Sequence, residues 1–293
     1  MSGVKEYHTR PGEGHADISA VPQDLWPPPM TVAPPAPGKR VKMTATDYKG
    51  TEVYHSLYLP ADWEGGDRFP MIVEYAGNGP YRNEHGDTCS GKVEDCNLGY
   101  GISGGEGFIW VGLPYISEDH RRNQLEWWGD IDATVEYCKA VVPRICKEYR
   151  GDPAAVILAG FSRGAIACNF IGLHDDAIAA LWRGFICHSH YDGVRAWAYP
   201  EDDRHSAAMR LRRLRHRPQF ISHEGSVTDT ERYLQEAMPQ GRFTFQAVPY
   251  RNHTDSWVLR DIPARKTVRR WLQDALRMEM PSNSTTKSIP IEH

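Results

Sequence analysis

Short apolar runs recur along the chain from about residue 41 onwards, and longer stretches with a helical pattern separate them. Six runs have the length of a strand: Met71–Tyr75, Phe108–Leu113, Ala155–Ala159, Gly184–Cys187, Gln219–Ser222 and Phe243–Val248. These runs are apolar throughout and do not alternate with polar residues. Such runs are typical of strands that are covered on both faces, as in a parallel sheet.

The stretches between the runs predict five helices: Trp128–Tyr149, Gly164–Gly172, Ala207–Leu214, Thr230–Ala237 and Ile262–Arg277. Alternating strands and helices indicate βαβ units with right-handed crossovers. Two further strands, Val41–Ala45 and Glu52–Leu59, flank the turn residues 47–50 and predict an antiparallel hairpin. The expected fold class is α/β, with a mostly parallel central sheet, helices on both faces and an antiparallel N-terminal hairpin.

Proline marks off the start of the chain. Eight of the 21 prolines lie in residues 1–40, where stretches such as Trp26–Pro29 lack amide donors and favour an extended conformation. We expect an extended arm over residues 1–40, which is either a recognition arm for a partner or a plain linker. One domain follows over residues 41–279, and residues 280–293 form a polar, flexible tail.

The charge balance narrows the class of partner. Lys and Arg number 34 against 38 Asp and Glu, a net charge of −4, so no broad positive field would attract a nucleic acid. No window approaches about 18 uninterrupted apolar residues, which predicts no membrane span. The first 30 residues lack a signal-peptide core, so a secreted or periplasmic origin would require a removed leader. The compartment and the oligomeric state stay open.

One motif has the form of a nucleophile elbow. Gly160-Phe161-Ser162-Arg163-Gly164 follows an apolar strand and precedes a helix that starts with small residues. A serine nucleophile stands on such a sharp strand-to-helix turn, where glycines two positions away avoid clashes. We expect Ser162 to be the nucleophile and the amide of Arg163, at the helix N-terminus, to face a developing oxyanion.

A serine nucleophile needs a base within hydrogen-bond reach, and the position of His253 fits this role. His253 lies in the loop between the last expected strand and the last long helix. In a parallel sheet the carboxyl ends of the strands open on one edge, so this loop reaches the same side as Ser162. The sequence therefore predicts that Ser162 and His253 meet.

With the order serine, acid, histidine on a mostly parallel sheet, the chain from about residue 41 to residue 278 resembles an α/β-hydrolase. The resemblance places the acid after the strand at 219–222. Glu224 follows this strand directly and precedes His253 by the spacing typical of the family, whereas Asp229 lies in a Thr228–Glu231 pattern that reads as a capping box. Glu224 is preferred, Asp229 is the alternative acid, and Asp192 is a third candidate.

The resemblance also implies the second oxyanion donor and the absence of a cofactor. The loop from Glu74 to Tyr81 is similar to the family's His-Gly loop, with Ala76 where the histidine usually stands. The amide of Asn78, or of Gly77, would then face the oxyanion. A triad of this kind needs no cofactor.

The segment His188-Ser189-His190-Tyr191-Asp192-Gly193 offers a possible metal motif. Alternation along a strand would put His188, His190 and Asp192 on one face. The segment is similar to the HxHxDH motif of metallo-hydrolases, but Gly193 stands where the last histidine is required. We therefore expect no metal, and we expect His190 to line the substrate pocket.

Two local features complete the expectations. Cys89 and Cys96 share a polar loop, where a disulfide and two free thiols are equally consistent with the sequence. The basic run Arg210–Arg217 is expected to be a solvated helix face.

The resulting hypothesis is a serine esterase that acts through an acyl-enzyme on a small-molecule or glycan-linked ester. The resemblance is to bacterial esterases of the feruloyl, acetyl-xylan and dienelactone-hydrolase type, which implies carbohydrate-linked or aromatic acyl esters. Two alternatives stay open. One is a prolyl-oligopeptidase-like serine peptidase, and the other is a catalytically silent protein of the same fold that binds a glycan or a partner.

Overall fold

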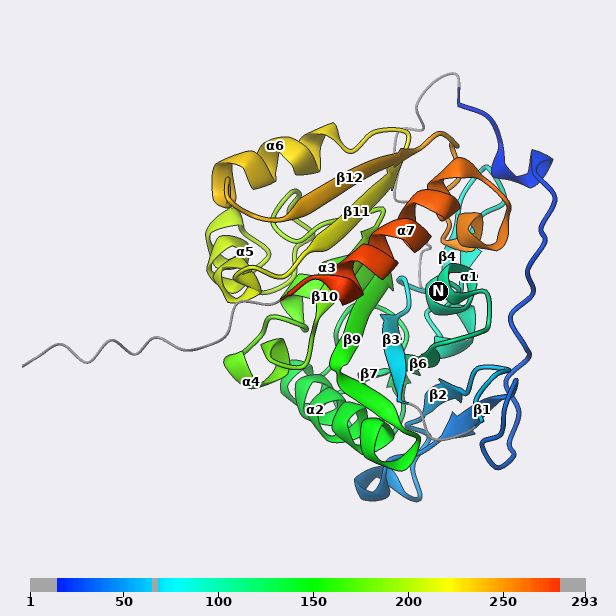
Figure 1. Cartoon of the computed structure of the whole chain (residues 1–293). Helices are drawn as coiled ribbons and strands as arrows, with labels where there is room; N and C mark the ends of the chain where they lie inside the picture. The colour runs from blue at the N-terminus through cyan, green and yellow to red at the C-terminus, as the bar shows by residue number, and fades with distance from the viewer. Residues whose placement is uncertain (1–14, 65–67, 280–293) are drawn as a thin grey trace, which may run out of the picture.

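An eight-stranded sheet forms the centre of the computed structural model, which describes residues 15–64 and 68–279 (Figure 1). The strand order is β1-β2-β6-β3-β9-β10-β11-β12. These strands are β1 (Arg40–Met43), β2 (His55–Tyr58), β3 (Phe69–Tyr75), β6 (Ile109–Leu113), β9 (Gly151–Phe161), β10 (Gly184–His188), β11 (Gln219–Glu224) and β12 (Phe243–Val248). β2 runs antiparallel to β1 and β6, and all other neighbours are parallel. The expected α/β class and the antiparallel start are confirmed.

Helices and short pairs of strands connect the sheet. The helices are α1 (Leu98–Ser103), α2 (Ile131–Glu148), α3 (Arg163–Phe170), α4 (Asp176–Ala179), α5 (Arg204–Leu211), α6 (Thr228–Ala237) and α7 (Pro263–Arg277). The 3-10 turns are η1 (Ile18–Ala20), η2 (Thr46–Tyr48), η3 (Val93–Asp95), η4 (Arg212–Leu214) and η5 (Ser256–Leu259). The short strands β4 (Tyr81–Arg82) and β5 (Thr88–Cys89) pair with each other, as do β7 (Tyr115–Ile116) and β8 (Asn123–Gln124). The hydrophobic pattern did not predict α1 or α4, which are the two shortest α-helices described.

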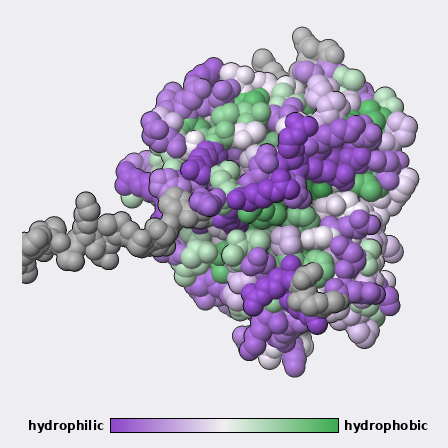
Figure 2. Space-filling view, viewed as in Figure 1, coloured by the Kyte–Doolittle hydropathy of each residue, from purple (hydrophilic) through white to green (hydrophobic). Residues whose placement is uncertain are grey.

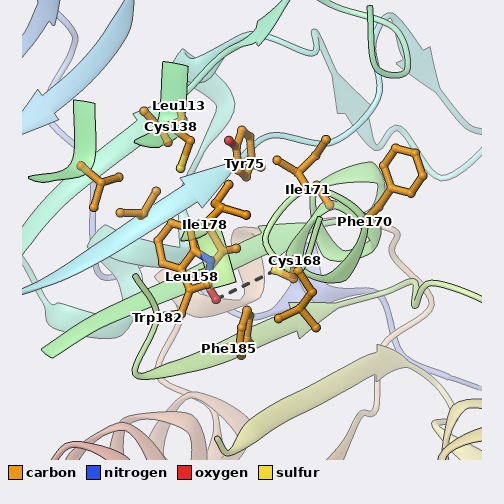
Figure 3. Packing of buried hydrophobic residues seen from close by; sticks show 14 of the residues in the cluster. Tyr75, Leu113, Cys138, Leu158, Cys168, Phe170, Ile171, Ile178, Trp182 and Phe185 are labelled. Carbon is orange, nitrogen blue, oxygen red and sulfur yellow. Dashed lines mark hydrogen bonds between the residues drawn. The ribbon is translucent and has the colours of Figure 1, made fainter. Parts of the chain in front are cut away.

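Alternate residues of the central strands enter two separate apolar clusters. Val73 and Leu158 belong to a cluster with α2 and α3, whereas Ile72 and Ile157 belong to one with α1 and α7. Figure 3 shows the first cluster, where strand residues Tyr75, Leu158 and Phe185 lie near Cys168 and Ile171. The sheet is therefore covered on both faces, which explains why its strands are apolar throughout.

Helix α7 covers its face of the sheet with one apolar stripe. Its buried apolar side chains, Ala264, Val268, Trp271, Leu272 and Ala275, recur at the spacing of one helix face. Where α7 lies, Figure 2 shows mainly hydrophilic side chains on the outside of the molecule. Pro263 at the start of the helix is compatible with the first helical turn, because its missing N–H would have no intrahelical partner there.

A buried carboxylate fixes the start of α1. Glu74, in β3, is fully buried and accepts hydrogen bonds from the amides of Leu98 (3.0 Å) and Gly99 (2.8 Å). It also accepts one from Trp110 Nε1 at 2.8 Å. These hydrogen bonds satisfy amides of the first turn, which have no acceptor within the helix, so Glu74 holds α1 against the sheet.

Residues 15–39 run extended along the outside of the sheet and helices. Their contacts include bridges from Thr31 to Val41 and from Pro37 to Leu59, and Ile18 is buried in the apolar cluster of α7. The division into arm, domain and tail stays a prediction, and residues 1–14 and 280–293 lie outside the described residues. In the described part of the chain, none of the helices has the length and apolarity needed to span a membrane.

The sequence is consistent with either a disulfide or two free thiols at Cys89 and Cys96, and the structure has two free thiols. Both cysteines are free and buried, so a disulfide between them is wrong. Cys89 ends β5, and its Sγ lies within 3.1 Å of the position that a Cβ on Gly77 would occupy. The thiol therefore fills space beneath the loop after β3.

Buried histidines make the fold sensitive to acid. Burial lowers the pKa of His55 from its usual 6.5 to about 3, and its Nδ1 lies 2.8 Å from the Tyr137 hydroxyl. The folded chain therefore keeps this ring neutral while the unfolded chain takes up a proton below pH 6.5. Burial also lowers the pKa of His188 to about 4, and it lowers the pKa of His223.

We predict that the free energy of unfolding falls between pH 7 and pH 5 and that His55→Asn removes part of this fall. From the pKa difference, His55 accounts for about 2 kcal/mol of the loss over this range. Urea denaturation at both pH values measures it. Tyr137→Phe is the matched control, since it lowers stability but keeps the histidine and hence the pH dependence. An unchanged pH dependence in His55→Asn would contradict the prediction.

Candidate active site

Ser162 stands on a tight turn between β9 and α3. Its φ of 54° lies in the left-handed region, which is uncommon for a residue with a side chain. A Cβ on Gly160 would lie 2.0 Å from the carbonyl oxygen of Gly164, and a Cβ on Gly164 would lie 2.0 Å from that of Tyr75. The two glycines are therefore required for this turn, which presents the Ser162 hydroxyl at the carboxyl edge of the sheet.

His253 lies in the loop after β12 and reaches Ser162. Its Nε2 is 3.0 Å from Ser162 Oγ, and its Nδ1 is 2.6 Å from Glu224 Oε1. Glu224 is the last residue of β11, so the three side chains come from the ends of β9, β11 and β12. Both Ser162 (8% exposed) and His253 (5% exposed) are buried, which limits access of water to the hydrogen bond between them.

The environment of Glu224 favours its charged form. Burial by itself would raise the pKa of this carboxyl, but the charge of His253 and the hydrogen bond from His253 outweigh burial. The net result is a pKa below the usual range. Glu224 is thus an ionised acceptor beside the imidazole.

The other two candidate acids lie elsewhere. Asp229 is exposed in the first turn of α6 and forms an ion pair with Arg232 at 3.2 Å. Asp192 is buried and accepts hydrogen bonds from Arg210 Nε (2.9 Å) and Nη2 (3.0 Å). The structure therefore brings Glu224, rather than Asp229 or Asp192, to His253.

Two sequence interpretations near these acids are wrong. The N-cap of α6 is Val227, without a side-chain cap, and Thr228 is already helical, so the expected capping box does not form. The basic run is not a solvated face throughout, because Arg210 and Arg217 are buried. Arg210 is buried because Asp192, on the neighbouring segment, provides its counter-charge.

The expected oxyanion residues lie around the start of α3. Gly77 and Asn78 follow β3, and Asn78 Oδ1 accepts a hydrogen bond from the amide of Trp127 at 2.6 Å. Arg163 is the first residue of α3, so its own amide has no acceptor within the helix. Its buried side chain donates to the carbonyl oxygens of Gly77 (2.9 Å) and Trp127 and lies over the ring of Tyr115. The sequence motif gave no signal for this second role of Arg163, which ties two loops beside Ser162 together.

The segment after β10 does not continue as a strand. β10 ends at His188, and the φ of Ser189 is 86°, so the expected alternation of His188, His190 and Asp192 on one face is wrong. His188 contacts Ser222 Oγ (2.9 Å) and the Thr254 carbonyl oxygen (3.1 Å), while Asp192 pairs with Arg210. Over residues 15–64 and 68–279, no group of three or more His, Cys, Asp or Glu side chains is arranged to hold a metal.

His190 packs directly against the imidazole of His253. Their ring centroids are 5.1 Å apart, and the ring of Trp197 lies 4.7 Å from His190 on another side. Burial lowers the pKa of His190 well below its usual value, so its ring is neutral. The rings of His253, His190 and Trp197 thus form one continuous aromatic surface.

A cavity of about 600 Å³ opens next to this surface. Its lining includes Glu224, His190 and the neighbouring Ser189, together with Trp197 and Tyr233, whereas Ser162 and His253 are not among its lining residues. Arg195, Arg204 and Arg232 also line it, and so do the carboxylates of Asp229 and Glu236, which makes its wall polar with charges of both signs. The cavity is large enough for a small ligand.

Asp87 and the arm hold the loop that carries His253. The Asp87 carboxylate accepts hydrogen bonds from the amide of His253 and from Asn252 Nδ2, both at 2.9 Å. Asn252 Oδ1 in turn accepts one from the amide of Ile18 at 2.8 Å. Sequence reasoning missed both contacts, because they join segments that are distant in the chain and have no shared motif.

Comparison with known proteins identifies the fold. No protein-family model matches the chain, and no curated protein matches its sequence. The order of the sheet and the turn at Ser162 are those of the α/β-hydrolase fold, and solved esterase structures match it. The protein therefore has the α/β-hydrolase fold.

Several of the similar structures are esterases, and three of them illustrate the extent of the similarity. Esterase 2 of Thermogutta terrifontis is 16% identical with a TM-score of 0.54, and the match covers 84% of this chain and 97% of that one. An esterase from Rhizomucor miehei is 12% identical with a TM-score of 0.53, and the match covers 81% and 84% of the two chains. The feruloyl esterase module of Clostridium thermocellum, in a complex with sinapinate, is 18% identical with a TM-score of 0.50, and the match covers 87% and 94%.

Some of the similar structures are much longer than this chain. The chain spans 41% of the AtxE2 isopeptidase and 62% of a thermostable esterase.

We predict that Asp87→Ala loosens the His253 loop. The change leaves two buried donors, the amide of His253 and Asn252 Nδ2, without their acceptor, which costs about 1–3 kcal/mol for each unsatisfied group. Urea denaturation should show the lower stability, and amide hydrogen exchange should become faster at residues 250–255. Asp229→Ala, which removes an exposed carboxylate, serves as the control and should change stability by about 0.5 kcal/mol or less. Equal effects of the two changes would refute the assignment.

Proposed function

We propose that the protein is a serine hydrolase that cleaves carboxylic esters through an acyl-enzyme intermediate. The observation that carries this proposal is the continuous contact from Ser162 Oγ to His253 Nε2 (3.0 Å) and from His253 Nδ1 to Glu224 Oε1 (2.6 Å). A nucleophile, a base and an acid that orients the base are the parts that acyl transfer needs. The esterases among the similar structures support the same reaction class.

In the first half of the reaction, Ser162 Oγ attacks the ester carbonyl carbon while His253 Nε2 takes the hydroxyl proton. The carbonyl oxygen becomes the oxyanion of a tetrahedral intermediate, which accepts hydrogen bonds from the amides of Arg163 and of Asn78 or Gly77. The intermediate collapses, the alcohol leaves with the proton from His253, and the acyl group stays on Ser162. Glu224 stays ionised and stabilises the imidazolium without taking its proton.

In the second half, water repeats the attack on the acyl carbon. His253 takes a proton from water, the same amides hold the second oxyanion, and the acid leaves as Ser162 regains its proton. In these steps the chain supplies the nucleophile, the proton carrier and the oxyanion donors, which are Ser162, His253 and backbone amides.

The cavity beside His190 supports an ester with a polar or aromatic part. Its lining combines the rings of Trp197 and Tyr233 with hydrophilic side chains, a mixture that suits stacking on a sugar or on an aromatic acyl group. The similar feruloyl esterase module, which was solved with sinapinate, supports an ester of an aromatic acid as the substrate class.

We predict that the protein releases a burst of p-nitrophenol from p-nitrophenyl acetate, with an amplitude equal to the enzyme concentration. Ser162→Ala should abolish the burst and lower kcat by at least about 10³-fold, because the nucleophile is gone. Ser56→Ala removes another buried serine hydroxyl, in β2, and should keep the burst. Activity that survives in Ser162→Ala would sink the proposal, and no turnover by the wild-type protein would favour a silent binding protein.

We predict that Glu224→Gln lowers kcat by about 10²- to 10⁴-fold, since the amide cannot fix the imidazole in the required tautomer or balance its charge. Asp229→Asn should lower kcat much less, because the Asp229 side chain lines the cavity and pairs with Arg232, while the contact to His253 comes from Glu224. Steady-state kinetics on folded protein, checked by circular dichroism, compares the two. A larger loss in Asp229→Asn than in Glu224→Gln would reverse the assignment of the acid.

A further inference from the structure

Ser189 lies between the acid and the base of the site. Its Oγ is 2.8 Å from Glu224 Oε1 and 2.8 Å from His253 Nδ1. The residue is buried, with 3% of its surface exposed. No sequence motif pointed to Ser189, which stands between the two histidines of a segment first considered for metal binding.

The backbone places this hydroxyl by leaving the strand conformation. Ser189 directly follows β10, and its amide still donates to the Ser222 carbonyl oxygen of β11 at 2.7 Å. Its φ of 86° lies in the left-handed region, where residues other than glycine are strained. The chain therefore remains paired with β11 while the Ser189 side chain turns towards Glu224 and His253.

The positions of the protons on His253 and Ser189 determine the role of the Ser189 hydroxyl. His253 Nε2 must be free to accept from Ser162, so the ring proton is on Nδ1 and is donated to Glu224 Oε1. Ser189 Oγ carries one proton, which it donates to the same Oε1, and a lone pair of Oγ then faces the Nδ1 proton. Both contacts stabilise the tautomer that leaves Nε2 as an acceptor.

The Ser189 hydroxyl is an important hydrogen-bond donor to the Glu224 carboxylate. Its other oxygen, Oε2, is buried and has no hydrogen-bond partner among the described residues. Oε1 therefore receives the hydrogen bonds from both His253 and Ser189. An ionised buried carboxylate needs such donors to stay charged and in place.

We propose that Ser189 is a positioning residue that holds Glu224 Oε1 and the Nδ1 proton of His253 in the arrangement that Ser162 needs for attack. The proposal rests on the proposed function, because positioning has a measurable effect only if Ser162 is the nucleophile. It adds a fourth side chain to the three already assigned.

The first test is Ser189→Ala with p-nitrophenyl acetate as substrate. We expect kcat to fall about 10- to 100-fold, the range for losing one hydrogen bond to a charged group, with KM nearly unchanged. Ser189→Thr keeps a hydroxyl and should recover most of kcat. The proton NMR signal of His253 Nδ1–H, identified by its absence in His253→Ala, should shift or broaden in the alanine variant and return in the threonine variant.

Backbone strain separates this role from a purely structural one. Glycine relieves a left-handed φ and threonine, being β-branched, worsens it, so the expected order of thermal stability is Ser189→Gly above Ser189→Ala and Ser189→Thr lowest. The expected order of kcat is the reverse: threonine above alanine and glycine. Ser56→Ala controls for the loss of a buried hydroxyl far from the site and should keep the wild-type kcat.

The outcomes discriminate between the two proposals. Wild-type kcat in both Ser189→Ala and Ser189→Gly, with Ser162→Ala inactive, would overturn the role of Ser189 and leave the proposed function standing. A kcat that follows thermal stability across the three variants would also overturn it. Activity in Ser162→Ala would instead remove the proposed function on which this role depends.

Discussion

The close approach of backbone to backbone at the turn before α3 is the constraint on which the rest of the site depends. At Gly160 and Gly164 the neighbouring carbonyl oxygens leave no space for a Cβ, and between them Ser162 takes a left-handed φ. The amide of Ser162 donates to the His188 carbonyl oxygen at 2.9 Å, which ties the turn to β10. Because Gly164 also lies against Tyr75 of β3, three adjacent strands define the position of one hydroxyl.

The strands beside β9 also place polar residues of the site at or after their carboxyl ends. β10 leads to Ser189, β11 ends in Glu224, and the loop after β12 carries His253, so successive strand ends each supply one polar group to the same edge. Parallel strands make this convergence possible, since their carboxyl ends all open on one side. Two apolar clusters, one on each face, pack against the strands behind the site. Glu74 and Arg163 fix the adjacent helix and loops through buried hydrogen bonds.

Much of this arrangement follows from local patterns in the sequence. The apolar runs gave the strands of the large sheet, and the glycine spacing around Ser162 gave the turn, because both depend on residues close together in the chain. The preference for Glu224 came instead from the resemblance to α/β-hydrolases, which places the acid after this strand at a typical spacing from His253. The capping box at Thr228 was misleading because the helix begins one residue earlier, after Val227, and the amide of Thr228 donates to Ser226 Oγ at 3.2 Å.

Other features depend on distant partners and left no trace in the sequence. Arg210 is buried because it pairs with Asp192. Asp87, between β4 and β5, binds the amide of His253 because these two segments meet in the fold. The direction of the Ser189 side chain depends on a φ that no pattern of residue types predicts. Cys89 and Cys96 form no bond in spite of their shared loop, because each is buried in its own packing environment. Pairwise contacts across long sequence separations are what a single sequence does not display.

The bond between the amide of Ile18 and Asn252 sets a limit on when the site can be completed. These residues are 234 positions apart, so the bond closes nearly the whole chain into one loop. During synthesis on a ribosome, residues 15–39 emerge before β12, so the amide of Ile18 has no partner until β12 and the loop after it have followed. Contacts of such long separation form late and slowly in folding. The loop that carries His253 can therefore gain this hydrogen bond only after the segments around residues 18 and 252 have both been made and have met.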